Sequence, residues 1–257
     1  MIVLYIVLAI IASIVVFMLI IILRTLFLIT QRPIEHLYKR RSSESNYCKY
    51  NEWPYKTIDI VLALEDARFF NHHGYDIDAM KRAFRRNLRE RRVVFGGSTI
   101  TQQLAKNLYL NFDRQISRKL IELFISIYIE RKLSKIEILE LYLNVIYYGN
   151  NQYGIYNASK FYFNKECRDL SINQIFLLLC TLSTPTVANP LVNQEKFFKI
   201  KNTKLCQVLW TGNDKKYISL IENYGPDNLD PDLQKHDIIN NDNVRMSNEE
   251  YGPKVYR

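Results

Sequence analysis

The chain has 257 residues, which is enough for one well-buried domain and an anchor but too few for two full enzymatic domains. Lysine and arginine outnumber aspartate and glutamate by 35 to 26, which favours an anionic partner such as phosphate groups, an acidic membrane surface or nucleic acid. The 4 cysteines include no CxxC pair and no histidine clusters with them, which argues against a zinc site.

The first 23 residues carry no charged side chain. About 20 apolar residues in a helix are enough to cross the hydrocarbon core of a bilayer. A cleavable signal peptide fits less well, because no basic residue precedes the apolar run and no A-x-A site follows it. We therefore predict the following organisation: a transmembrane anchor over residues 1–29, a polar connector over 30–57, a folded domain over 58–210 and a polar, loosely ordered tail over 211–257.

The folded domain shows mostly helical patterns, and its strand signals are weak. Ser134 with Glu137 and Ser171 with Gln174 each form a capping box, the pattern that begins a helix. The remaining helices are indicated by apolar residues that recur on one face. After an apolar segment over residues 58–70, helices are expected over residues 76–92, 98–110, 113–133, 135–147 and 171–182.

The segment ALEDARFFNHHG, residues 63–74, places Glu65 and Asp66 at the end of an apolar helix. Desolvation beside an apolar wall can tune a carboxylate for work as a general acid or base. A Glu-Asp pair at a solvated helix end would look the same, so this segment alone does not establish catalysis.

The segment GGSTITQQLAKNL, residues 96–108, begins with two glycines and then Ser98 or Thr99 as a helix cap. A polar side rich in amides follows, opposite Ile100 and Leu104. Amides and one lysine suit sugar hydroxyls and a phosphate. A solvated face is the alternative, although such faces usually carry glutamate and lysine in place of these amides. The polar residues are Gln102, Gln103, Lys106 and Asn107.

In DRQISRKLIELF, residues 113–124, Arg114, Arg118 and Glu122 recur every four residues and share one helix face. The face could be a cationic wall for an anionic leaving group. It could equally be an Arg118–Glu122 ion pair of small energetic value. The spacing leaves both interpretations open.

Taken together and in this order, these segments resemble glycosyltransferase family 51, the peptidoglycan glycosyltransferase module. The resemblance covers residues 58–190 and is carried by EDARFFNHHG, GGSTITQQLAKNL, RKLIEL, SKIEILELYLN…YYG and YFNK. A single anchor without a transpeptidase domain is similar to the monofunctional biosynthetic members. The resemblance implies a mainly α, lysozyme-like fold with a cleft between a core lobe and a membrane-dipping jaw.

The implied reaction polymerises lipid II into glycan strands for cell-wall biogenesis, with inversion and release of undecaprenyl pyrophosphate. Glu65 matches the base that deprotonates the acceptor 4-hydroxyl, and Glu122 matches a second glutamate on the donor side. Residues that match substrate-binding positions are Asp66, Ser98, Gln102, Gln103, Lys106, Asn107, Arg114 and Arg118. The resemblance implies no organic cofactor, and some members use a divalent cation, Mg²⁺ or Mn²⁺, at the donor side. The expected partners are lipid II, the growing strand, membrane lipids and other cell-wall enzymes, and nucleic acid is not among them.

The chain departs from the family pattern at a few positions. The family usually has a lysine immediately before the second glutamate, and this chain has Ile121 there. Asn157 stands where the family has the first alanine of a pair, and Gln174 begins a segment that is usually richer in alanine. Ile121 removes one cation from the donor side, whereas the other two changes are expected to alter packing.

Two other functions share parts of this pattern. A lytic transglycosylase or lysozyme-like hydrolase would have the same fold and glutamates, but its leaving group is a sugar and needs no cluster of Lys106, Arg114 and Arg118. An inactive membrane-anchored scaffold that binds glycan would have no need of both Glu65 and Glu122.

Two features make opposite predictions about the side of the membrane on which the main domain lies. Arg24, Arg32, Lys39, Arg40 and Arg41 follow the apolar segment, and the positive-inside rule would place the main domain in the cytoplasm. The resemblance implies the other side, because lipid II is polymerised after it has been moved outward. We expect a single-pass protein of the bacterial cytoplasmic membrane with residues 30–257 outside.

Overall fold

A computed structural model of the chain describes residues 1–54, 56–91, 96–110 and 116–182. Within these residues the regular elements are helical, and the only strand-like pairing is an isolated antiparallel bridge between Tyr147 and Tyr153. The mainly α fold predicted from the sequence is therefore confirmed for the described part of the chain.

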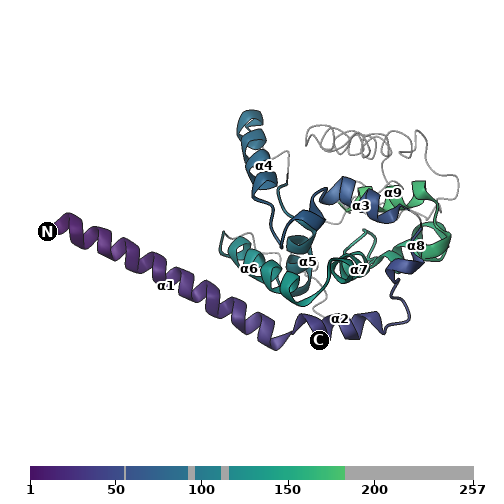
Figure 1. Cartoon of the computed structure of the whole chain (residues 1–257), viewed down its shortest axis with the longest axis horizontal. Coiled ribbons are helices and arrows are strands. Elements are labelled where there is room, and N and C mark those ends of the chain that lie inside the picture. The colour runs from purple at the N-terminus through teal and green to yellow at the C-terminus, as the bar shows by residue number, and fades with distance from the viewer. Residues whose placement is uncertain (55, 92–95, 111–115, 183–257) are drawn as a thin grey trace, which may run out of the picture.

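Figure 1 shows the helices in the order in which they follow one another along the chain. The α-helices are α1 (Ile2–Gln31), α2 (Ile34–Ser42), α3 (Thr57–Glu65), α4 (Ile77–Glu90), α5 (Ile100–Tyr109), α6 (Ile116–Lys132), α7 (Lys135–Val145), α8 (Ile155–Phe163) and α9 (Ile172–Thr181). The short 3₁₀ turns are η1 (Tyr50–Glu52), η2 (Phe69–Asn71) and η3 (Cys167–Asp169).

Helix α1 projects from the domain as a long rod (Figure 1). It is long and apolar enough to cross a membrane by length and composition, and most of its side chains before Ile21 are exposed. Near its end Ile21 and Thr25 are buried, where α1 packs against α6. The hydroxyl of Tyr109 on α5 donates a hydrogen bond of 2.7 Å to the carbonyl of Arg32, just after α1. The apolar helix is therefore joined directly to the folded domain.

The predicted connector also packs on the domain. Ile34, at the start of α2, is fully buried, and α2 contacts α7. The side chain of Asn144 on α7 accepts the N–H of Cys48 and donates to its carbonyl, both over 2.9 Å. Arg41 donates to the carbonyl of Asn144 over 3.1 Å. The predicted domain limits stay a prediction, and the described part of the connector belongs to the same packed body.

Helices α5, α6 and α7 pack against one another at the centre of the domain (Figure 1). The apolar face predicted for α5 is buried, with Ile100 and Leu104 fully covered. The predicted capping boxes begin α7 at Ser134 and α9 at Ser171. Every residue of α7 from Ile138 onward is buried. This helix is therefore part of the core against which α5 and α6 pack.

Gly74 allows the loop after η2 to approach α6 closely. Its φ is +94°, which an L-residue rarely adopts, and a Cβ there would lie 2.9 Å from backbone atoms of Ser126. The loop that follows Glu65 therefore rests directly on the backbone of α6.

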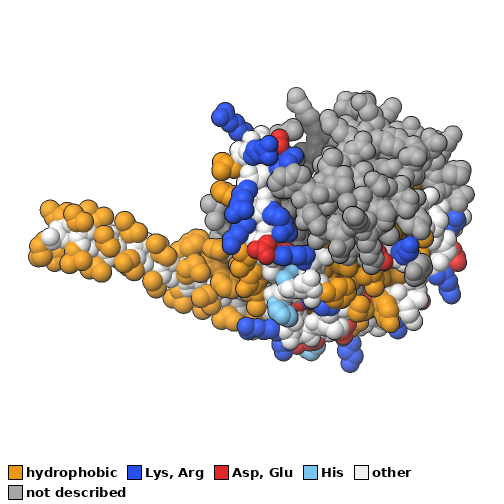
Figure 2. All heavy atoms as spheres, turned by 45° about the horizontal axis from the view of Figure 1, so that its top comes forward, with side chains coloured by type: hydrophobic (Ala, Val, Ile, Leu, Met, Phe, Trp, Pro, Cys, Tyr) orange, Lys and Arg blue, Asp and Glu red, His pale blue; other side chains and the backbone are white. Residues whose placement is uncertain are grey.

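Helix α4 stands at the edge of the domain and buries none of its own residues. The basic amphipathic helix predicted over residues 76–92 is thus found at Ile77–Glu90. Its exposed apolar side chains are Ile77, Met80, Phe84 and Leu88. Figure 2 shows Lys and Arg side chains gathered along the same helix, namely Lys81, Arg82, Arg85, Arg86 and Arg89.

Candidate active site

Helix α3 ends at Glu65, and the residues before it are buried, so Glu65 lies at the rim of an apolar wall as the sequence predicts. Its Oε2 accepts a hydrogen bond of 3.0 Å from Nε2 of Gln103 on α5. Oε1 of Gln103 accepts a second bond, also 3.0 Å, from the hydroxyl of Tyr142 on α7. An amide supported from the core therefore holds one oxygen of Glu65.

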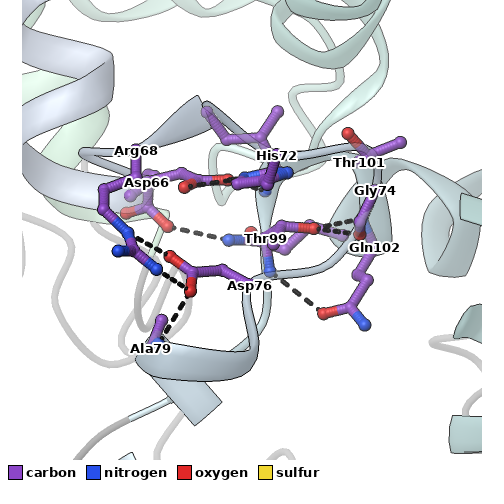
Figure 3. Close-up of polar contacts among 12 residues, drawn as sticks. Asp66, Arg68, His72, Gly74, Asp76, Ala79, Thr99, Thr101 and Gln102 are labelled. Carbon is purple, nitrogen blue, oxygen red and sulfur yellow. Dashed lines mark hydrogen bonds and ion pairs between the residues drawn. The ribbon is translucent and has the colours of Figure 1, made fainter. Parts of the chain in front are cut away.

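Asp66, the next residue, faces the interior. Its Oδ2 lies 3.0 Å from Nε2 of His72 and accepts the N–H of Ile100 over 3.0 Å (Figure 3). A helix N-terminus has unpaired N–H groups and a positive dipole end, so a carboxylate is favoured there on both counts. The substrate contact predicted for Asp66 stays a prediction, whereas its observed contacts join α3 to α5.

The start of α5 is fixed by a capping box. Oγ1 of Thr99 accepts the N–H of Gln102 over 3.1 Å, and Oε1 of Gln102 accepts the N–H of Thr99 over 3.1 Å. The hydroxyl of Thr99 also donates to the carbonyl of Gly74 over 2.8 Å (Figure 3). Gln102 is only 1% exposed, so its observed role is to cap the helix, and its predicted substrate contact is untested.

Arg68 and Asp76 fix the loop that leads from Glu65 to α4. Arg68 forms a bidentate ion pair with the buried Asp76, which also accepts the N–H of Ala79 over 2.9 Å (Figure 3). Burial alone would raise the pKa of Asp76, but the hydrogen bonds from Arg68 and Ala79 outweigh it and hold the pKa below its ordinary value of 3.8.

A second cluster gathers around Glu122 on α6, which is 3% exposed. Glu122 forms an ion pair with Lys119, and the Lys119 ammonium also donates to the hydroxyl of Ser98 over 2.9 Å. Burial lowers the pKa of Lys106 on α5; Glu122 opposes this shift, and Arg118 and Lys119 add to it. We refer to Lys106, Arg118 and Lys119 as the cationic cluster.

The contacts of Glu122 exclude the Arg118–Glu122 ion pair that the spacing allowed, whereas a role in binding the leaving group stays a prediction. Its ion-pair partner is Lys119 and not Arg118. The Nε of Arg118 is buried and has no hydrogen-bond partner in the described part of the chain. A cationic side chain that keeps a buried donor without a partner, close to a carboxylate, suits an anionic ligand.

Helix α5 links the two groups of residues. Gln103, which contacts Glu65, and Lys106 are three residues apart and therefore lie on the same side of the helix. Asn107 is half-buried on the same helix. Arg114, also predicted to bind the substrate, lies outside the described residues.

The residue immediately before Glu122 lies in the core. Ile121 is 1% exposed and packs in the core, so this departure from the family pattern is used for packing. Lys119, His72 and Tyr142 were not predicted as site residues. The RK pair at 118–119 was visible in the sequence, but nothing local indicates that His72 and Tyr142 reach the α3–α5 junction.

The described residues contain no group of three or more His, Cys, Asp or Glu side chains that could hold a metal ion. Glu122 brings one carboxylate, which is already paired with Lys119. These side chains do not by themselves fit the divalent cation that some family members use, and we derive no step through one.

Comparison with known proteins gives consistent matches. Residues 30–209 match the family model described as Transglycosylase. The chain is 40% identical over 188 residues to penicillin-binding protein 1A of Vibrio cholerae, covering 73% of this chain and 22% of that protein. It is 41% identical over 172 residues to penicillin-binding protein 1F of Bacillus subtilis, covering 67% of this chain and 24% of that protein. The chain therefore spans about a quarter of the length of these relatives.

We predict that Asp76→Asn lowers the free energy of unfolding by about 1–2 kcal/mol near neutral pH, since Arg68 is partly exposed. The pKa of Asp76 is lower in the folded protein than its value of 3.8 in the unfolded chain, so its carboxylate stabilises the folded state fully at a pH above 3.8. This stabilisation is lost as the pH falls through the pKa of the folded protein. The melting temperatures of the wild type and of Asp76→Asn should therefore approach each other as the pH is lowered.

Asp78→Asn is the matched control, because Asp78 is an exposed partner of the same arginine. It should change the melting temperature little at any pH. A difference in melting temperature between the wild type and Asp76→Asn that stayed constant down to about pH 2 would contradict the stabilising role of the ionised Asp76.

Proposed function

The chain belongs to the transglycosylase family, glycosyltransferase family 51, and on this premise we propose that it is a peptidoglycan glycosyltransferase that polymerises lipid II. The observation that carries the proposal is that one side of α5 serves both groups. Gln103 contacts Glu65, and Lys106, one turn further along the helix, belongs to the cationic cluster. Transfer of a sugar from a pyrophosphate needs a base at the acceptor hydroxyl and positive charge at the leaving group.

Glu65 is the proposed base. The 4-hydroxyl of the acceptor sugar gives its proton to the Glu65 carboxylate as the hydroxyl oxygen attacks the anomeric carbon of the growing strand. The bond from that carbon to the pyrophosphate breaks, and the configuration inverts because attack comes from the opposite face. The hydrogen bond from Gln103 orients the carboxylate for this attack.

The cationic cluster is the proposed site of the leaving pyrophosphate. Fixed positive charge stabilises the negative charge that develops there, and partial burial of Lys106 strengthens the effect. Lys119 keeps a cation against Glu122 although the position before Glu122 is Ile121. A glycan-cleaving enzyme expels a sugar and has no use for this cluster, so the cluster favours the polymerase.

The surface of α4 supports action at a membrane. Phe84 and Leu88 are each 69% exposed, and cationic side chains flank them along the helix (Figure 2). Helices with this composition lie in the membrane interface, with the apolar side inserted and the cations at anionic headgroups. In the view of Figure 1, α4 runs across the direction of α1, as expected for a helix lying on the surface that α1 crosses.

We expect Glu65→Gln to abolish polymerisation of lipid II by the purified full chain, with a fall of about 10²–10⁴-fold, because proton transfer is lost. The melting temperature should stay near that of the wild type, since Glu65 is only half-buried. Glu166→Gln, which breaks a surface ion pair with Lys160, is the control and should polymerise normally. Near-normal turnover by Glu65→Gln would exclude Glu65 as the base.

Lys106→Met should lower kcat/KM by roughly 100-fold, because a charge aimed at the leaving group is removed. Burial disfavours the charged form of Lys106. The melting temperature should therefore be equal to or higher than that of the wild type. Lys160→Met removes a partly exposed surface lysine and should change neither quantity. A parallel loss of activity and stability in Lys106→Met would instead indicate a structural lysine.

The proposed topology places the domain outside the cytoplasm and can be tested with reporters fused to Arg257. An enzyme that is active only after export should give a signal, and a protein that fluoresces only in the cytoplasm should stay dark. The opposite pattern would overturn the topology, and with it the polymerase assignment, because lipid II is polymerised only after it has been moved outward.

A further inference from the structure

We propose that Tyr142 is a positioning residue for Glu65: its hydroxyl holds the Gln103 amide in the one orientation that presents the NH₂ group to the carboxylate. The inference deepens the proposed function and rests on it, because it assigns a support to the proposed base.

Three helices meet in this chain of hydrogen bonds. Glu65 ends α3, Gln103 lies in the middle of α5, and Tyr142 lies in α7. The two bonds, from Tyr142 to Gln103 and from Gln103 to Glu65, are each 3.0 Å long. Tyr142 is fully buried and the other two side chains are half-buried. The line therefore runs from the core to the candidate site.

The chemistry of the three groups dictates the direction of both bonds. An ionised carboxylate can only accept, so the side of Gln103 that faces Glu65 must be its NH₂ group. Oε1 of Gln103 then faces Tyr142, which must donate. A primary amide has nearly the same shape in its flipped orientation, so shape alone would not prevent the flip. The hydroxyl of Tyr142 favours the observed orientation of the amide, because it donates to Oε1 of Gln103 on the buried side.

Tyr142 is suited to be a permanent donor. Burial, with smaller effects from Glu65, Tyr148 and Asp66, keeps its pKa well above the ordinary tyrosine value, so the hydroxyl stays protonated. Among the described residues, these three are the titratable groups whose charge acts on the Tyr142 hydroxyl. Asp66 accepts from Ile100, and Tyr148 donates to the carbonyl of Leu143 over 3.3 Å.

Without the hydroxyl, the amide is free to turn. In the turned state an amide oxygen would face an oxygen of Glu65, an arrangement that is relieved only when Glu65 takes up a proton or rotates away. Both outcomes remove a correctly placed base. Substrate binding should change little, because the phosphates are bound elsewhere, at the cationic cluster.

The test compares Tyr142→Phe with Tyr162→Phe in the full chain. Tyr162 is a matched control, because it is 1% exposed and its hydroxyl donates to the carbonyl of Tyr148 over 2.9 Å. Tyr142→Phe should lower kcat for lipid II roughly 10-fold with little change in KM, and move the acidic limb of the kcat/KM profile to higher pH. Tyr162→Phe should leave kcat and the pH profile unchanged. Wild-type kcat and pH profile in Tyr142→Phe would overturn the proposal.

A stability experiment tests the same chain of bonds without using activity. Tyr142→Phe should lower the melting temperature less when Glu65→Gln is also present, because the introduced amide can pair with either side of Gln103. Equal losses in the two backgrounds would overturn the positioning role. If the wild-type protein fails to polymerise lipid II, the proposed function fails, and this comparison still decides whether Tyr142 orients Gln103.

Discussion

The position of the candidate base depends on the buried carboxylate of Asp66. It closes the N-terminus of α5 through the N–H of Ile100 and pairs with His72 in the loop after α3. The carbonyl of His72 accepts from Lys135 over 2.6 Å, at the start of α7. One buried carboxylate thus sets the relative positions of the three helices that carry Glu65, Gln103 and Tyr142. Removing it would leave buried donors without a partner, which costs more than the bonds themselves contribute.

The polar residues of the segments 63–74 and 96–108 fall into two groups, one with structural contacts and one that lies at the candidate site. Asp66, Thr99 and Gln102 turn inward and satisfy backbone or side-chain donors. Gln103 donates to Glu65, and the charge of Glu122 acts on the pKa of Lys106. This division explains why so many polar side chains occur in a segment that packs against the core. The inward residues fix the ends of the helices. The positions of Gln103 and Lys106 at the candidate site depend on that fixed backbone.

Local features were predictable from the sequence, and long-range contacts were not. The capping boxes at Ser134 and Ser171 depend on residues close together in the chain, and both are observed. Helical spacing placed Arg118 and Glu122 on one face and left open whether they pair, and it did not indicate that Lys119 reaches Glu122 from the preceding turn. The Tyr142–Gln103 bond joins helices that are distant in sequence. Spacing within a helix gives no information about what lies opposite it.

The rigid join between α1 and the domain has a mechanical consequence. One unbroken helix runs from Ile2 to Gln31, and its last turns are packed against α6. A transmembrane helix changes its tilt when the thickness of the hydrocarbon layer changes. If α1 spans the membrane as proposed, any such tilt is transmitted to α6 and turns the folded domain relative to the membrane surface. Under the proposed function, the thickness of the bilayer would therefore set the angle at which the candidate site meets its lipid-linked substrate.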